Sequence, residues 1–246
     1  MITILDHLAV GTPDLSAGWD LFAGVMGGTW VYGGDSPGFW WGQLEFASGP
    51  KIELLTPTGG PDSAFLDRFL AVRGGGPHHF NFLVPDIEAA LARVKAAGIE
   101  PVGVNLTNPG WKEAFLHPRA AHGIVIQLAQ QAGSPASAPP RELPQPGPAA
   151  RLDLIEHHVS DLDDAVRLFR DVLDGHLDVA GVGAGSAELT WPGGKRIRLV
   201  HEDGLPLGGA LHHIQFTRMA GMVSTEERER ANLLAKRLGL AVELAG

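Results

Sequence analysis

Cysteine is absent from this chain of 246 residues. Its absence excludes disulfide bonds, thiolate metal sites and a cysteine nucleophile, and it fits a cytoplasmic location. Apolar runs are short, and none approaches the roughly 18 residues that a transmembrane helix needs. The N-terminus lacks a basic segment followed by an apolar one, so we expect neither a signal peptide nor membrane association.

Basic residues are also few. The chain has 19 Lys and Arg against 28 Asp and Glu, which gives a formal net charge of −9. No basic stripe is visible, so we do not expect nucleic acid as a partner. Apolar residues make up 44% of the chain, enough for an ordinary core. A small-molecule substrate is the expected partner.

Proline, alanine and glycine concentrate in one segment, residues 131–150, with the sequence QAGSPASAPPRELPQPGPAA. A segment of this composition without an apolar period is typical of an extended, semi-rigid linker. It predicts a first domain at 1–130 and a second at 151–246.

The first domain contains an internal repeat. LDHLAVGTPDLSA at 5–17 is echoed by HFNFLVPDIEAA at 79–90. In each copy a strand ends near a Pro-Asp pair whose aspartate, Asp14 or Asp86, can cap the following helix. Each copy then continues with shorter strands, predicted at 29–32, 39–47, 51–55, 100–104, 111–116 and 123–129, and a connecting helix is predicted at 62–72.

The second domain follows the same pattern less completely. A strand at 152–158 precedes a helix that carries Leu162, Val166, Phe169 and Leu173 on one face. Strands at 187–191 and 196–200 follow, then a further unit with a strand at 211–218 and a helix at 225–238. The expected fold is α+β: paired βαβββ modules forming a curved, cup-like mixed sheet, in two tandem domains of which the second is incomplete.

Four strands of the first domain each carry one polar side chain that could bind a metal: His7, Glu53, His79 and Gln127. The spacing repeats, because the first two lie 46 residues apart and the last two 48. Any one of them alone could be a structural residue, but together they favour one metal held between two related halves.

Strand alternation indicates where these side chains point. Phe80 and Phe82 share one face of their strand, which leaves His79 and Asn81 on the other. We expect the bulky face to pack under the helices and the polar face to line the concavity. Two imidazoles and two oxygens suit a divalent metal ion without choosing among Zn, Ni, Co, Mn and Fe. Such an ion would act as a Lewis acid that stabilises an enolate.

The motifs LDHLAV (5–10), KIELLTP (51–57), GPHHFNF (76–82) and GIVIQL (123–128) carry a family resemblance. The first domain resembles the vicinal oxygen chelate superfamily of glyoxalases, bleomycin-resistance proteins and dioxygenases, and within it methylmalonyl-CoA epimerase most. The resemblance implies metal ligands at His7, Glu53, His79 and Gln127, and an acyl-CoA as one candidate substrate.

Two positions depart from the epimerase pattern. Gln127 stands where the epimerases have a carboxylate, and Gln43 where their second acid falls. A glutamine amide cannot act as a general base. Glu45, two residues on and on the same face as Gln43, becomes the best candidate base, with Gln43 as a polar contact to substrate.

In the second domain, Leu154 and Arg198 match the positions of His7 and Glu53, and only His213 repeats His79. We expect no metal there and a structural role as a pseudo-partner, so the protein would be a monomer (a pseudo-dimer) or a homodimer.

The leading hypothesis is a metal-dependent isomerase or lyase. The first alternative is a non-catalytic binding protein that sequesters small molecules in a pocket lined by aromatic residues, namely Trp30, Phe39, Trp40, Trp41 and Trp111. The other is a degenerate paralogue retained for assembly.

Overall fold

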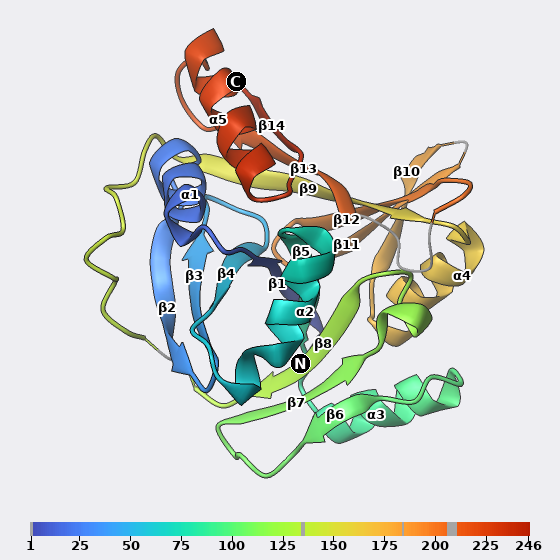
Figure 1. Ribbon diagram of the computed structural model, residues 1–246. Helices are drawn as coiled ribbons and strands as arrows, with labels where there is room; N and C mark the ends of the chain where they lie inside the picture. The colour runs from blue at the N-terminus through green and yellow to red at the C-terminus, as the bar shows by residue number, and fades with distance from the viewer. Residues whose placement is uncertain (1, 134–135, 184, 206–210) are drawn as a thin grey trace. The chain divides into compact units, whose positions relative to one another are not determined.

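The computed structural model describes residues 2–133, 136–183, 185–205 and 211–246. It confirms the α+β fold, with two mixed sheets (Figure 1). The eight-stranded sheet has the order β2-β3-β4-β1-β5-β8-β7-β6, and the six-stranded sheet has the order β10-β11-β12-β9-β13-β14. The linker at 131–150 and the domain limits it implies stay predictions, and residues 134 and 135 lie outside the described residues.

The larger sheet comes from the first 131 residues. Its strands are β1 (Ile4–Gly11), β2 (Thr29–Ser36), β3 (Phe39–Glu45), β4 (Lys51–Pro57), β5 (Gly76–Leu83), β6 (Val102–Asn105), β7 (Trp111–Leu116) and β8 (Val125–Gln131). Its helical segments are α1 (Leu15–Trp19), the π-helical η1 (Asp20–Val25), α2 (Ala64–Arg73), α3 (Ile87–Ala96) and the short 3-10 turns η2 (Pro61–Ser63) and η3 (Pro118–Ala120).

The smaller sheet follows the proline-rich segment. Its strands are β9 (Ala150–Val159), β10 (His176–Gly183), β11 (Ser186–Trp191), β12 (Lys195–His201), β13 (Leu211–Arg218) and β14 (Val242–Ala245). Its helical segments are α4 (Leu162–Arg167), the π-helical η4 (Leu168–Val172) and α5 (Thr225–Arg237).

The predicted helix starts are confirmed by their caps. The Asp14 carboxylate accepts the backbone N–H of Ala17, and the Asp86 carboxylate accepts the N–H groups of Glu88 and Ala89. These contacts satisfy donors that the first helical turn leaves unpaired. Within the described ranges, no helix combines the length and the apolar character needed to cross a membrane.

The chain divides into two compact units that do not follow its linear order. The first unit comprises Met1–His7, His79–Ser134 and Ile155–His212, and the second comprises Leu8–His78, Pro135–Leu154 and His213–Gly246. Each unit therefore combines a module of the larger sheet with part of the smaller one. β1, β5, β9 and β13 contribute residues to both units.

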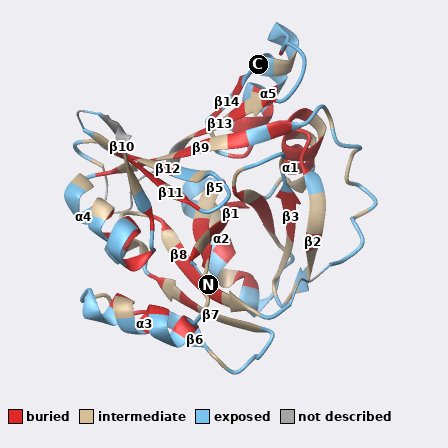
Figure 2. Ribbon diagram, turned by 180° about the vertical axis from the view of Figure 1, so that it is seen from behind, coloured by how far each residue is buried: buried red, intermediate tan, exposed pale blue. Residues whose placement is uncertain are grey.

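The core of the first unit lies on the apolar face of β5. The ring of Phe169, from η4, lies 6.3 Å from that of Phe80 and 6.4 Å from that of Phe82. Trp191 of β11 lies 5.3 Å from Phe82, and the buried His157 contacts Phe80. The bulky face of β5 thus packs under a helical segment, as expected, and that segment follows the proline-rich residues 131–150 in the chain. Figure 2 shows β5 and β8 as largely buried.

The core of the second unit is also built from both sheets. Phe216 of β13 lies 6.4 Å from Phe22 and 5.0 Å from Phe46, measured between ring centroids. The Arg218 side chain is buried, and its guanidinium donates to the Val25 carbonyl and to the Glu227 carboxylate. α5 packs against α1 and η1. The second unit thus has an aromatic core of its own and a buried cation paired with an anion.

In the second unit, an aromatic cluster covers the face of β3 that carries Trp40. Trp30 and Trp40 stack with centroids 6.1 Å apart, and Trp19 of α1 meets both edge-on. The Trp30 indole N–H donates to the Ser137 carbonyl at 2.8 Å. Trp30 and Trp40 therefore pack against Trp19 of α1, and both stay half-buried.

Gly42→Ala is expected to destabilise the protein by about 1–3 kcal/mol through overpacking. A Cβ at Gly42 would lie 2.3 Å from a ring atom of Trp40 and 2.7 Å from one of Trp30. Urea unfolding measures the effect. Gly34→Ala on β2 is the matched control, because a Cβ there meets no described atom within 4 Å. Equal unfolding midpoints for the two variants would contradict this packing.

Candidate metal site

Two buried histidines lie side by side in the first unit. His7 is on β1 and His79 is on β5, and their side chains are almost inaccessible to solvent. The ring centroids lie 5.6 Å apart at an interplanar angle of 68°. Each ring offers one ligand nitrogen, and these two nitrogens lie within 4.8 Å of each other. The structure therefore brings together the two imidazoles that the repeat predicted.

A buried carboxylate holds the first of these rings. Asp6 Oδ2 lies 2.8 Å from His7 Nδ1, and both side chains are buried. In metal sites a carboxylate on one ring nitrogen orients the imidazole and raises its basicity as a ligand. With Nδ1 engaged by Asp6, Nε2 is the nitrogen of His7 that can ligate a metal.

Glu53 lies in the second unit, buried on β4. Its Cα partner on β3 is Gln43, and the Gln43 Nε2 donates to Glu53 Oε2 at 2.7 Å. The role of Glu53 as a ligand beside His7 and His79 stays a prediction. Two imidazoles and a carboxylate are donors that divalent transition metals accept. The donor chemistry therefore fits the divalent ion that the sequence predicts.

The Gln127 amide lies in a polar network on the same face as His79. Gln127 pairs with Asn81 across β8 and β5, and its Oε1 accepts from Asn81 Nδ2 at 2.8 Å. Its Nε2 donates to Glu113 Oε2, also at 2.8 Å. Both ends of the amide thus have protein partners, and the role of Gln127 as a metal ligand stays a prediction.

Glu113 is a further member of this network, which the motifs and their spacing did not predict. It lies half-buried on β7, and its Oε2 also accepts the Trp111 indole N–H at 2.8 Å. Alternation along WKEAFL sets Trp111, Glu113 and Phe115 opposite the buried Ala114 and Leu116. That alternation was the available signal that Glu113 shares the polar face with Gln127.

Gln43 and Glu45, the predicted contact and base, lie on β3. The register pairs Gln43 with both Tyr32 and Glu53. Glu45 is the exposed last residue of the strand and pairs with Thr29. The catalytic roles of Gln43 and Glu45 stay predictions.

His78 packs rather than joining the histidine pair. Its ring lies 5.6 Å from Phe65 and 5.0 Å from Phe69, both on α2. Burial lowers the pKa of His78 to about 4, so the ring is neutral at pH 7. On the same helix, Leu66 forms an apolar cluster with Ala9 of β1 and Leu55 of β4. Because Leu55 lies two residues beyond Glu53, α2 covers that strand next to the carboxylate.

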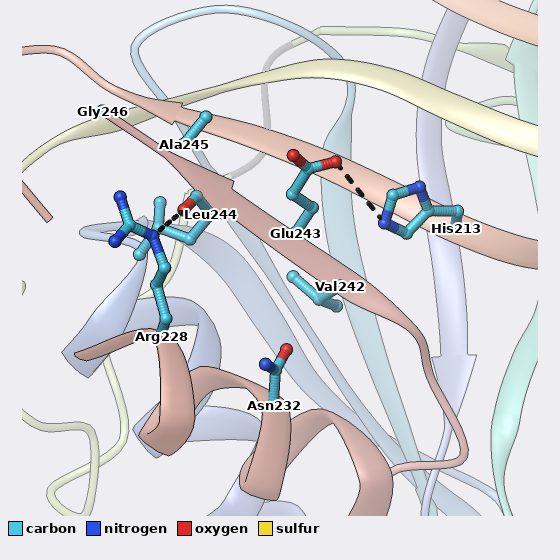
Figure 3. A pocket seen from close by; sticks show the side chains of 8 residues that line it. All are labelled: His213, Arg228, Asn232, Val242, Glu243, Leu244, Ala245 and Gly246. Atoms are coloured by element: carbon cyan, nitrogen blue, oxygen red, sulfur yellow. Dashed lines mark hydrogen bonds and ion pairs between the residues drawn. The ribbon is translucent and has the colours of Figure 1, made fainter. Parts of the chain in front are cut away.

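Other groups occupy the corresponding positions of the smaller sheet. Arg198 pairs with Glu188 at 3.1 Å, and Leu154 is buried. His213 lies 3.8 Å from the carboxylate of Glu243, in a pocket that Arg228 and Asn232 also line (Figure 3). These positions hold ion pairs and an apolar side chain in the structure.

The chain is similar to a known protein family and to two epimerases. A model described as "Glyoxalase/Bleomycin resistance protein/Dioxygenase superfamily" matches residues 6–115. An ethylmalonyl-CoA/methylmalonyl-CoA epimerase of Cereibacter sphaeroides is 34% identical over 137 residues, which are 53% of this chain and 99% of that protein. A mitochondrial methylmalonyl-CoA epimerase of Dictyostelium discoideum is 29% identical over 143 residues, 52% of this chain and 78% of that protein.

A solved structure resembles nearly the whole chain. It is a xylose isomerase-like TIM barrel/4-hydroxyphenylpyruvate dioxygenase fusion protein, with a TM-score of 0.58 and 20% identity over 94% of this chain and 38% of that one. At this identity the likeness shows the fold alone. The family follows from the 34% identity to the Cereibacter sphaeroides epimerase over 99% of that protein, in agreement with the match to residues 6–115. The chain belongs to the glyoxalase/bleomycin resistance protein/dioxygenase superfamily.

Proposed function

We propose that this protein is a metal-dependent isomerase of the epimerase type, acting on an acyl-CoA with an acidic C–H beside its thioester carbonyl. The observation that carries the proposal is the buried pair of His7 and His79, with Asp6 on the first ring. The substrate class rests on the two epimerase relatives. A binding protein for apolar molecules has no need of two buried imidazoles and a buried carboxylate.

In this proposal His7, His79 and Glu53 hold a divalent ion, and Gln127 is the fourth ligand. The ion would be Zn, Ni, Co, Mn or Fe, since nitrogen and oxygen donors suit each of them. When bound, it supplies a Lewis acid that lowers the energy of negative charge on a carbonyl oxygen.

The chain's own residues have supporting tasks. Asp6 fixes the His7 ring, and Gln43 fixes the Glu53 carboxylate by its hydrogen bond. The cluster of Leu66, Ala9 and Leu55 keeps water from the neighbouring part of β4. Excluding water strengthens the electrostatic interactions of a buried carboxylate.

A solvent-exchange experiment tests the function. The purified, metal-loaded protein is incubated in D2O with methylmalonyl-CoA of one configuration, and proton NMR follows deuterium at the α-carbon and loss of configuration. We expect both to proceed at an enzymatic rate. Protein that contains metal but exchanges no α-proton, with this substrate or with ethylmalonyl-CoA, would contradict the proposed function.

Asp6→Asn is expected to weaken metal binding by about 10- to 100-fold, because removing a partner that orients a ligand typically has this effect. The asparagine keeps the shape of the side chain but loses its charge. Competition with a chromogenic chelator measures the dissociation constant. Asp35→Asn, at an exposed position, is the control and should bind like the wild type. An unchanged constant in Asp6→Asn would show that Asp6 does not support the ligand.

A further inference from the structure

Isomerisation needs a group that removes a proton from carbon, and the two glutamines at the acid positions of the epimerase pattern cannot do so. Gln43 and Gln127 carry no basic nitrogen or carboxylate. Glu53 is assigned to the metal in the proposed function. The base must therefore come from another side chain.

Glu113 has the geometry for this task. Its carboxylate lies next to Gln127, one strand further along the sheet, on the face that also carries His79. It is half-buried, whereas Glu45 is exposed at the end of its strand. A base held in one position reacts faster than a mobile one, because its orientation is already set.

The two hydrogen bonds to Glu113 fall on the same oxygen. Trp111 Nε1 and Gln127 Nε2 both donate to Oε2, each at 2.8 Å. Among the described residues, no other side chain donates to this carboxylate within hydrogen-bond distance. The two donors hold the carboxylate plane and leave Oε1 as the oxygen that can accept a proton.

We propose that Glu113 is the catalytic base of this enzyme, in place of a carboxylate at position 127. The proposal rests on the proposed isomerase function. Glu113 Oε1 takes the α-proton as the C–H bond breaks, and the bonding electron pair moves to the carbonyl oxygen. A solvent water on the opposite face of the planar enolate then delivers a proton to the α-carbon as the carbonyl re-forms, which inverts the configuration, and Glu113 Oε1 releases its proton to solvent.

The network also gives Gln127 a defined role. Its amide links Asn81 of β5 to Glu113 of β7, so three adjacent strands hold the base. In Gln127→Glu, a carboxylate oxygen would take the place of Gln127 Nε2, which lies 2.8 Å from Glu113 Oε2. Two such carboxylates repel each other unless one is protonated. Glutamine at 127 instead supplies a neutral N–H donor to Glu113 at this position.

The test compares Glu113→Gln with the wild type by the deuterium exchange assay. The variant keeps an oxygen that can accept both hydrogen bonds but loses the base. We expect exchange to fall by about 10²- to 10⁴-fold, the usual contribution of a general base, while metal content stays at the wild-type value. Glu100→Gln, at an exposed position on the same unit, is the matched control and should exchange normally.

The double variant Glu113→Gln with Gln127→Glu separates catalysis from structure. The carboxylate at position 127, one strand away, should raise the exchange rate at least about tenfold above that of Glu113→Gln, within the range of a general base. A merely structural role of Glu113 predicts no recovery.

The exchange assay also separates failure of the Glu113 proposal from failure of the isomerase function. Wild-type exchange in Glu113→Gln overturns the proposal and leaves the isomerase function standing. Loss of exchange in Glu45→Gln together with wild-type exchange in Glu113→Gln assigns the base to Glu45. Absence of exchange in metal-loaded wild-type protein overturns the isomerase function, and this proposal with it.

Discussion

Replacing His79 with alanine is expected to lower α-proton exchange by about 10³-fold or more. The proposed metal stabilises charge by several kcal/mol, and each 1.36 kcal/mol corresponds to about tenfold in rate. His79 lies against His7 within the first unit, so removing one ring leaves the ion with half of its nitrogen ligands. Deuterium incorporation measured at a fixed, limiting metal concentration gives the effect.

The control for His79→Ala is His213→Ala. The two histidines hold corresponding positions in the two sheets, but His213 pairs with Glu243 at the surface. Its removal should leave exchange unchanged. A wild-type rate in His79→Ala, with circular dichroism showing an intact fold, would mean that this imidazole has no part in the chemistry.

The second large effect concerns stability. Phe169→Ala is expected to lower the free energy of unfolding by about 3–5 kcal/mol, the usual cost of emptying a buried phenylalanine site. Phe169 is fully buried, and its ring contacts those of Phe80, Phe82, His157 and Trp191. Urea unfolding followed by tryptophan fluorescence measures the loss.

Phe65→Ala on α2 provides the comparison for Phe169→Ala. Its side chain is 37% exposed and should cost clearly less. A difference of under about 1 kcal/mol between the two variants would be inconsistent with a core at Phe169, because full burial of a phenylalanine is worth more than this. Such a result would also contradict the packing of Phe169 against Phe80 and Phe82 in the first unit.

Local sequence patterns predicted much of this fold. The aspartates at 14 and 86 marked helix starts because a carboxylate next to unpaired N–H groups is favourable in any tertiary context. Alternation separated Phe80 from His79 because successive strand residues point to opposite faces. The strand β10 was missed, since its sequence HLDVAGVG contains two glycines that weaken a strand pattern.

Contacts between distant segments could not be predicted in the same way. Phe169 was placed on the apolar face of a helix, but its partner Phe80 lies 89 residues earlier in the chain. The spacing of apolar residues along a helix does not indicate which sheet the helix covers. The division of the chain into two units, each made of distant segments, could not be predicted for the same reason. It depends on which modules pack together, and the sequence pattern within one module does not contain this information.

The candidate site shows the same division. Spacing brought out His7 and His79, whose rings lie side by side. The hydrogen bonds of Gln127 depend on the register of three strands, and a register is not set by one strand's sequence. Alternation along β7 predicts the face on which Glu113 lies. Its hydrogen bond to Gln127 depends on the register between β7 and β8, which neither strand's sequence sets alone.

Metal content, measured by inductively coupled plasma mass spectrometry, tests the central claim most directly. The wild-type protein, the His7→Ala and His79→Ala single variants and the double variant are purified alike and dialysed against one low concentration of divalent metal. We expect close to one equivalent of a transition metal per wild-type chain and background amounts in the double variant. A full equivalent in the double variant would show that these two imidazoles do not hold a metal ion.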